Sequence, residues 1–156
     1  ADAAYGDETG WREQLAGHGL TYALGIRPGT TVWWGDHQPL SEPAPSGRRG
    51  RPRTRVQRDA THQPISVIAL AQQLPAQAWR RVTWREGVAE PLVSRFARVR
   101  VRAAHRDRPH DEEWLIIEWP DEAEEPVHYW LSNLPKRLTW EAMADTVMGR
   151  WRIERD

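Results

Sequence analysis

The chain has 156 residues, a formal net charge of zero, 39% hydrophobic and 28% charged residues, and no cysteine. These values are typical of one globular domain, and the lack of cysteine excludes a disulfide framework and a thiolate zinc or iron–sulfur site. No apolar run approaches the roughly 20 residues that cross a bilayer, and the first ten residues lack the basic and apolar regions of a signal peptide, so we expect a cytoplasmic protein.

The zero net charge conceals an uneven distribution of charged residues. Residues 48–108 contain fifteen Arg and four acidic residues, whereas the rest of the chain contains seven Lys or Arg and eighteen Asp or Glu. Such a basic cluster attracts polyanions. The ten Trp residues are far above ordinary usage, and an exposed indole ring can stack on a base or a sugar.

The first 27 residues predict a β-α-β unit. Residues 1–3 indicate the end of a strand, and Asp7 is a candidate N-cap for a helix that Gly17 closes. The stretch 21–26 (TYALGI) is apolar on both faces, which is typical of a strand in a covered parallel sheet.

Residues 28–135 predict a β-rich segment. It opens with a short strand (TTVWW) and continues with a basic loop at about 38–64 that is rich in Pro, Ser, Gly and Arg. A short helix at about 66–74 follows. Later apolar and alternating runs predict strands near 80–84, 96–104, 114–119 and 127–132.

Two groups of arginines in this segment are candidates for DNA contact. The loop contributes Arg48, Arg49, Arg51, Arg53 and Arg55. The alternating run FARVRVR places Arg98, Arg100 and Arg102 on one strand face, for which a solvated surface and a DNA-facing surface are equally good interpretations. The acidic run 111–125 is better explained as a solvated turn than as a metal site, because consecutive acids on an exposed loop do not converge.

A helix is predicted from about residue 139 to the C-terminus. Its apolar stripe consists of Trp140, Met143, Val147 and Trp151. Glu154 falls about 20° from Val147 on this face. A carboxylate on an apolar face needs a cation, a donor or a metal. Arg150 lies one turn earlier, so a structural Arg150/Glu154 ion pair is an alternative to a functional role.

Asp2 is a second acid of the same kind. It sits at the carboxyl end of the first predicted strand, where α/β sheets place their sites. Carboxylates from separate elements, such as Asp2 and Glu154, can hold the two Mg²⁺ ions of a phosphoryl-transfer site.

The residues around these acids resemble the catalytic domain of bacterial insertion-sequence transposases of the DDE superfamily, in the branch with a β-rich insertion before the catalytic Glu. Asp2, Ala4 and Tyr5 match the D-x-(G/A)-(Y/F) context of that branch's second catalytic Asp. Arg150 and Glu154, in RWRIE, match its helical signature in register, and YWLSNLP resembles the strand and turn before that helix.

Three features depart from the family pattern. Val147 stands where the signature has Tyr, and the signature Lys position would lie beyond Asp156. The first catalytic Asp, which the family carries on an earlier strand, is absent. We therefore expect an internal fragment that is inactive on its own.

The resemblance implies an α/β fold with a partial RNase H-like core in residues 1–27 and 136–156, interrupted by a β-rich insertion over 28–135. It implies metal-dependent DNA cleavage and strand transfer at transposon ends. Asp2 and Glu154 would be catalytic ligands of two Mg²⁺ ions, for which Mn²⁺ can substitute, and Arg150 would contact a DNA phosphate. The implied partners are double-stranded DNA, as transposon ends and target, and a second copy in a homodimeric synaptic complex, with no membrane. The implied location is the bacterial cytoplasm, at the nucleoid when bound to DNA.

Trp130 is the candidate for a further role that the resemblance implies. In relatives with hairpin intermediates an insertion-domain Trp stacks on a flipped base, although the aligned position here is His128 and core packing is the favoured role for Trp130. A non-catalytic DNA-binding or regulatory transposase remnant is the main alternative to the enzyme. A carbohydrate-binding module fits poorly with fifteen Arg and a β-α-β opening.

Overall fold

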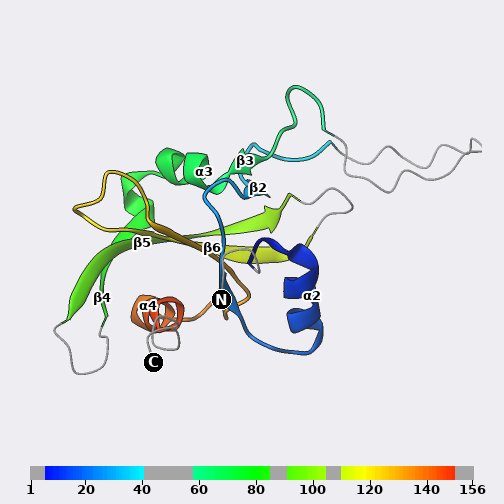
Figure 1. Ribbon diagram of the computed structural model, residues 1–156. Helices are drawn as coiled ribbons and strands as arrows, with labels where there is room; N and C mark the ends of the chain where they lie inside the picture. Colours follow the sequence, from blue (N-terminus) through cyan, green and yellow to red (C-terminus); the bar gives the residue numbers. More distant parts are fainter. Residues whose placement is uncertain (1–5, 41–57, 85–90, 105–109, 150–156) are drawn as a thin grey trace, which may run out of the picture.

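A computed structural model describes residues 6–40, 58–84, 91–104 and 110–149 (Figure 1). Its seven described strands form one sheet in the order β1-β7-β6-β5-β2-β3, with β4 also paired to β5. The strands are β1 Ala23–Gly25, β2 Thr31–Trp33, β3 Ile65–Ser66, β4 Trp79–Trp84, β5 Leu92–Ala103, β6 Glu112–Trp119 and β7 His128–Ser132. The helices are α2 Thr9–Gly17, α3 Val67–Gln73 and α4 Trp140–Met148, with a 3₁₀ turn at Ala76–Ala78.

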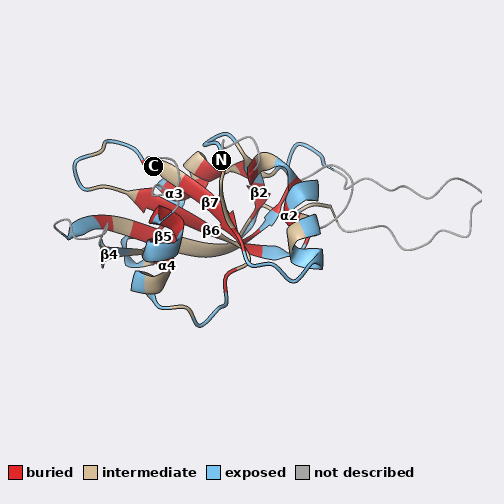
Figure 2. Ribbon diagram, turned by 60° about the horizontal axis from the view of Figure 1, so that its bottom comes forward, coloured by how far each residue is buried: buried red, intermediate tan, exposed pale blue. Residues whose placement is uncertain are grey.

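The sheet separates two hydrophobic cores. Side chains alternate between the two faces of a strand, so Phe96 of β5 packs on the α4 side whereas Ala97 and Val101 pack on the α3 side. Figure 1 shows α3 and α4 on opposite faces, and Figure 2 shows buried residues concentrated in the strands between them. The mixed helix-and-strand class predicted from the sequence is confirmed.

The α3-side core is built mainly from aliphatic residues. Val67, Leu70 and Ala71 of α3 are fully buried against β2, β5, β6 and β7. The Ser66 hydroxyl accepts a hydrogen bond from the Ala69 backbone N–H (3.4 Å), which caps the helix where the sequence predicted its start. Burying each large aliphatic side chain stabilises the fold by about 1.5–3 kcal/mol.

The α4-side core contains Met143 and Val147, as the apolar stripe predicted. Thr139 caps α4 by accepting a hydrogen bond from the Ala142 N–H (3.2 Å). The helix was expected to reach the C-terminus, but it ends at Met148 with Gly149 as its C-cap, consistent with the low helix propensity of glycine. The stripe position Trp151 and the predicted inward face of Glu154 lie outside the described residues.

The N-terminal region differs from the prediction in two respects. Within the described residues β1 pairs with β7 alone and antiparallel, whereas the sequence suggested a covered parallel sheet; the strand end predicted at residues 1–3 lies outside the described residues. The N-cap of α2 is Glu8 and not Asp7. The Asp7 carboxylate is engaged elsewhere, since it accepts hydrogen bonds from the Arg27 backbone N–H (3.3 Å) and from Thr30 Oγ1.

The sheet joins two of the three segments that the sequence suggested. β1 belongs to residues 1–27, and its partner β7 belongs to residues 28–135. The boundaries themselves stay a prediction. None of the described helices has the length and apolar character that a bilayer crossing requires.

Candidate nucleic-acid interface

The predicted site residues divide into two groups. Those outside the described residues are Asp2, Arg150, Glu154, Arg48, Arg49, Arg51, Arg53 and Arg55. Those that the structure places are Arg98, Arg100, Arg102 and Trp130. Among the described residues, no three His, Asp or Glu side chains form a group that could hold a metal ion.

The backbone at Gly6 is held tightly against β1. A Cβ atom at Gly6 would lie 1.8 Å from the carbonyl oxygen of Gly25, closer than any real side chain approaches. Only glycine therefore fits at position 6 without moving the backbone. Asp2 precedes Gly6 by four residues, a span of at most about 14 Å for an extended chain.

A buried cluster around Arg12 also binds the backbone of Gly6. Arg12 is 2% exposed, and its Nε donates to Glu113 Oε1 at 2.8 Å. Its Nη1 donates to the carbonyl of Gly6. The Tyr22 hydroxyl also donates to Glu113 Oε1, at 2.6 Å, and burial together with the charge of Glu113 raises the pKa of Tyr22 above its usual range. The cluster connects α2, the start of β1 and β6.

Sequence reasoning missed this cluster, although one signal was present. Glu113 precedes Leu115 and Ile117 at a period of two, so it belongs to the same strand face as two fully buried residues. An acid in that position requires a buried cation. Arg12 gave no such signal, because its neighbours on α2 are mostly exposed.

Arginine and tryptophan side chains alternate on the α4 side of the sheet. We call Arg80, Trp140, Arg98, Trp114 and Arg100 the Arg–Trp stack. The Arg98 guanidinium carbon lies 4.4 Å from the Trp140 ring centroid and 5.3 Å from that of Trp114. Arg80 lies 5.6 Å from the Trp140 centroid, and Arg100 lies 4.8 Å from that of Trp114. These distances are within the range of cation–π attraction.

The stack attaches the connection between β7 and α4 to the sheet. Arg98 Nη1 donates to the carbonyl of Leu138 at 2.7 Å, and Trp114 Nε1 donates to that of Leu134 at 3.1 Å. Partial burial and the charge of Arg80 lower the pKa of Arg98. Arg98 thus serves as an internal anchor in this structure.

The other two arginines of the predicted strand face also have internal partners. Arg100 Nη2 donates to the Glu112 carbonyl at 2.8 Å, and Arg102 Nη1 donates to the His110 carbonyl at 2.8 Å. The Glu112 carboxylate lies 3.5 Å from Arg100 Nε and 4.0 Å from Arg102 Nη2. Of the three arginines, Arg102 is exposed and the other two are half-buried.

Trp130 packs in the α4-side core. It is 5% exposed, and its ring centroid lies 5.5 Å from that of His128. This is the packing role that the sequence favoured. A base could stack on Trp130 only if the ring left the core.

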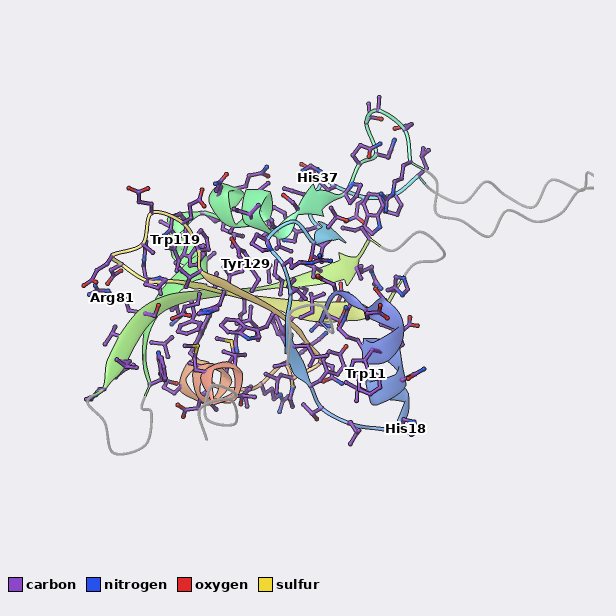
Figure 3. All side chains as sticks on the ribbon, viewed as in Figure 1. Trp11, His18, His37, Arg81, Trp119 and Tyr129 are labelled. Atoms are coloured by element: carbon purple, nitrogen blue, oxygen red, sulfur yellow. The ribbon has the colours of Figure 1, made fainter. Side chains whose placement is uncertain are left out.

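The acidic run contains both exposed and buried residues. Its turn is exposed as predicted. In this turn Asp121 pairs with Arg81 and, at 3.0 Å, with Arg95. Figure 3 labels Arg81 and Trp119 in this part of the sheet. Glu113 and Glu118 are buried instead. Glu118 Oε2 lies 2.7 Å from His128 Nδ1.

Comparison with known proteins identifies the family. A family model described as DDE superfamily endonuclease matches residues 1–91, which include Asp2 and extend to the end of the connection after β4. No curated protein and no solved structure matched the chain. Since the matched segment is more than half of the chain, the protein belongs to the DDE endonuclease superfamily, whose members share an RNase H-like α/β fold, generally depend on divalent metal ions and act on DNA.

Proposed function

We propose that this chain is catalytic-domain sequence of a bacterial insertion-sequence transposase, which cleaves DNA at transposon ends and transfers the strands to a target. The observation that carries the proposal is Asp2 in its D-A-A-Y context, inside the segment that matches the endonuclease family. The substrate would be double-stranded DNA, and the working assembly would be a homodimer on two transposon ends.

The carboxylates of Asp2 and Glu154 would hold two Mg²⁺ ions. Carboxylate oxygens are the ligands that Mg²⁺ and Mn²⁺ prefer, so the donor chemistry fits the group. When bound, such a metal pair activates an attacking water or 3′-hydroxyl and neutralises charge on the leaving oxygen. The residues of this chain would position these ligands and the DNA.

The described structure supports a convergence of the two acids near β1. Gly25 of β1 contacts Gly6, four residues after Asp2. Ala23 of the same strand packs against the α4-side core, and α4 leads toward Glu154. Described residues that neighbour the two candidate ligands in sequence, Gly6 and the end of α4, therefore pack near the same three-residue strand.

Arginines would hold the DNA around this centre. Arg150 would contact a phosphate near the cleaved bond, and the loop arginines at 48, 49, 51, 53 and 55 would grip the flanking duplex. Guanidinium groups suit this role because they bind phosphate oxygens in a bidentate manner. Arg98 and Arg100 would support the surface from within the Arg–Trp stack.

Paramagnetic Mn²⁺ offers a direct test on residues 1–156. We expect Mn²⁺ to broaden the amide NMR signals of Gly6 and Gly25 before those of the distant α3. Asp2→Asn should remove this selective broadening, and Glu154→Gln should lower the Mn²⁺ affinity about tenfold or more. Glu124→Gln, a change in the exposed acidic turn, is the matched control and should have no effect.

Two outcomes would count against the metal site. One is broadening near Gly6 that survives Asp2→Asn, because it would identify other ligands. The other is DNA binding by the wild type without any selective Mn²⁺ site, which would favour the non-catalytic DNA-binding alternative.

A further inference from the structure

One part of the α4 side of the sheet carries positive charge that has no acidic partner among the described residues. Arg80 is exposed, and no carboxylate among the described residues pairs with it. Its neighbour Arg81 projects from the same strand and pairs with Asp121. The two adjacent arginines therefore differ in whether their charge is already neutralised.

Other cationic side chains lie near Arg80, around the Arg–Trp stack and the segment before α4. Arg80 and Arg98 both lie over the Trp140 ring, and Arg98 donates to the carbonyl of Leu138. Lys136 and Arg137 directly precede Leu138, are exposed, and have no acidic partner among the described residues. The cations thus gather around the start of α4.

The local charges repel one another. Arg80 is close enough to Arg98 for its charge to help lower the pKa of Arg98. The first turn of α4 contains one acid, Glu141, which does not balance four cations. Like charges at short range are relieved by an anion that lies between them, and the field of such a cluster attracts polyanions.

We propose that Arg80, Lys136 and Arg137 form a phosphate-binding surface that takes the backbone of duplex DNA, with Arg98 and Trp140 as its rigid support. This inference rests on the proposed function, which supplies the polyanion, and it adds residues outside the basic loop. Arg98 is a positioning residue, because its hydrogen bond to Leu138 holds the segment that carries Lys136 and Arg137. Arg80 lies over the Trp140 ring and would bind the phosphate itself.

The salt dependence of DNA binding separates Arg80 from Arg81. Each phosphate contact contributes about 0.9 to the slope of log K against log salt concentration. One contact therefore makes the affinity roughly eightfold higher at 0.1 M salt than at 1 M salt. In fluorescence anisotropy with a labelled duplex, Arg80→Ser should lower the slope by about 0.9 and weaken binding several-fold at 0.1 M salt. Arg81→Ser changes the net charge equally and should leave the slope unchanged.

Two further variants complete the test. Lys136→Ser combined with Arg137→Ser should lower the slope by up to about 1.8. Arg80→Lys, which keeps the charge, should retain most of the wild-type slope. Arg80 is exposed, so each Arg80 variant should unfold at nearly the wild-type urea midpoint, which shows that binding and not folding has changed.

The outcomes distinguish the inference from the proposed function. Equal slopes for Arg80→Ser and Arg81→Ser, with wild-type binding intact, would overturn the phosphate-binding surface alone. A wild-type chain that does not bind duplex DNA in a salt-dependent manner would overturn both. Binding to phosphatidylserine vesicles that is lost in Arg80→Ser, while DNA binding is kept, would assign the surface to a membrane and refute the DNA interpretation.

Discussion

Breaking the buried ion pair between Arg12 and Glu113 should be one of the most destabilising single changes in this protein, because it leaves one charge buried without its partner. Substituting Arg12 with Met removes the cation but leaves the Glu113 carboxylate buried, since that side chain is 7% exposed. Its only other hydrogen-bond donor among the described side chains is the Tyr22 hydroxyl. Breaking a buried pair in this way costs about 3–5 kcal/mol. The free energy of unfolding of such a domain is about 5–15 kcal/mol, so roughly a fifth or more of the stability would be lost.

Urea unfolding followed by tryptophan fluorescence measures this loss, and a second substitution tests its cause. In the wild type, Glu113→Gln should destabilise the protein, because it weakens the pairing with Arg12. In the Arg12→Met background the same change should stabilise it, because it removes the uncompensated charge while an amide oxygen still accepts from Tyr22. An Arg12→Met loss below about 1 kcal/mol, or a Glu113→Gln effect of the same sign in both backgrounds, would refute the reasoning.

Two further predictions use matched pairs of substitutions. Gly6→Ala should destabilise the protein strongly in urea unfolding, because the new Cβ would lie 1.8 Å from a backbone oxygen. Gly10→Ala in α2 is the matched change: its Cβ meets nothing within 4 Å, so it should stabilise the protein by up to about 1 kcal/mol. Equal effects of the two substitutions would contradict the observed packing. Tyr129→Phe should be neutral or stabilising at pH 7, because its buried hydroxyl has no hydrogen-bond partner among the described residues, whereas Tyr22→Phe should destabilise by removing a donor to Glu113. Burial and a nearby acid raise the pKa of Tyr129 from 10.0 to about 12. Its ionisation therefore leaves stability unchanged below pH 10 and lowers it as the pH rises from 10 through 12, because the unfolded state loses the proton first. Tyr129→Phe should flatten that part of a pH titration of stability, and an unchanged profile would contradict this assignment.

Local features were predictable from the sequence. Ser66 and Thr139 mark the starts of α3 and α4, because each hydroxyl caps a helix within three residues of itself. The strands near residues 80, 96, 114 and 127 were predictable from their apolar and alternating runs. These signals act over a few residues, so no tertiary information is needed to interpret them.

Features that depend on distant partners were not predictable. The antiparallel pairing of β1 depends on β7, more than a hundred residues later, so an apolar strand alone suggested a covered parallel sheet. Asp7 did not cap α2 because Arg27 and Thr30 bind its carboxylate. Alternation placed Arg98 and Arg100 on one face, but Trp114 and Trp140, which cover that face, come from other elements.

The pairing of β1 with β7 has a consequence for the order of folding. Ala23 is paired with Ser132, so this strand pair closes a loop of more than a hundred residues. The length-dependent entropy cost of closing such a loop in an unfolded chain is about 4 kcal/mol. The β5–β6 and β6–β7 pairs join neighbouring segments and can form first, which shortens the effective loop. During synthesis, residues 23–25 would leave the ribosome long before β7 does, yet β1 can pair only after the whole of β7 has been made.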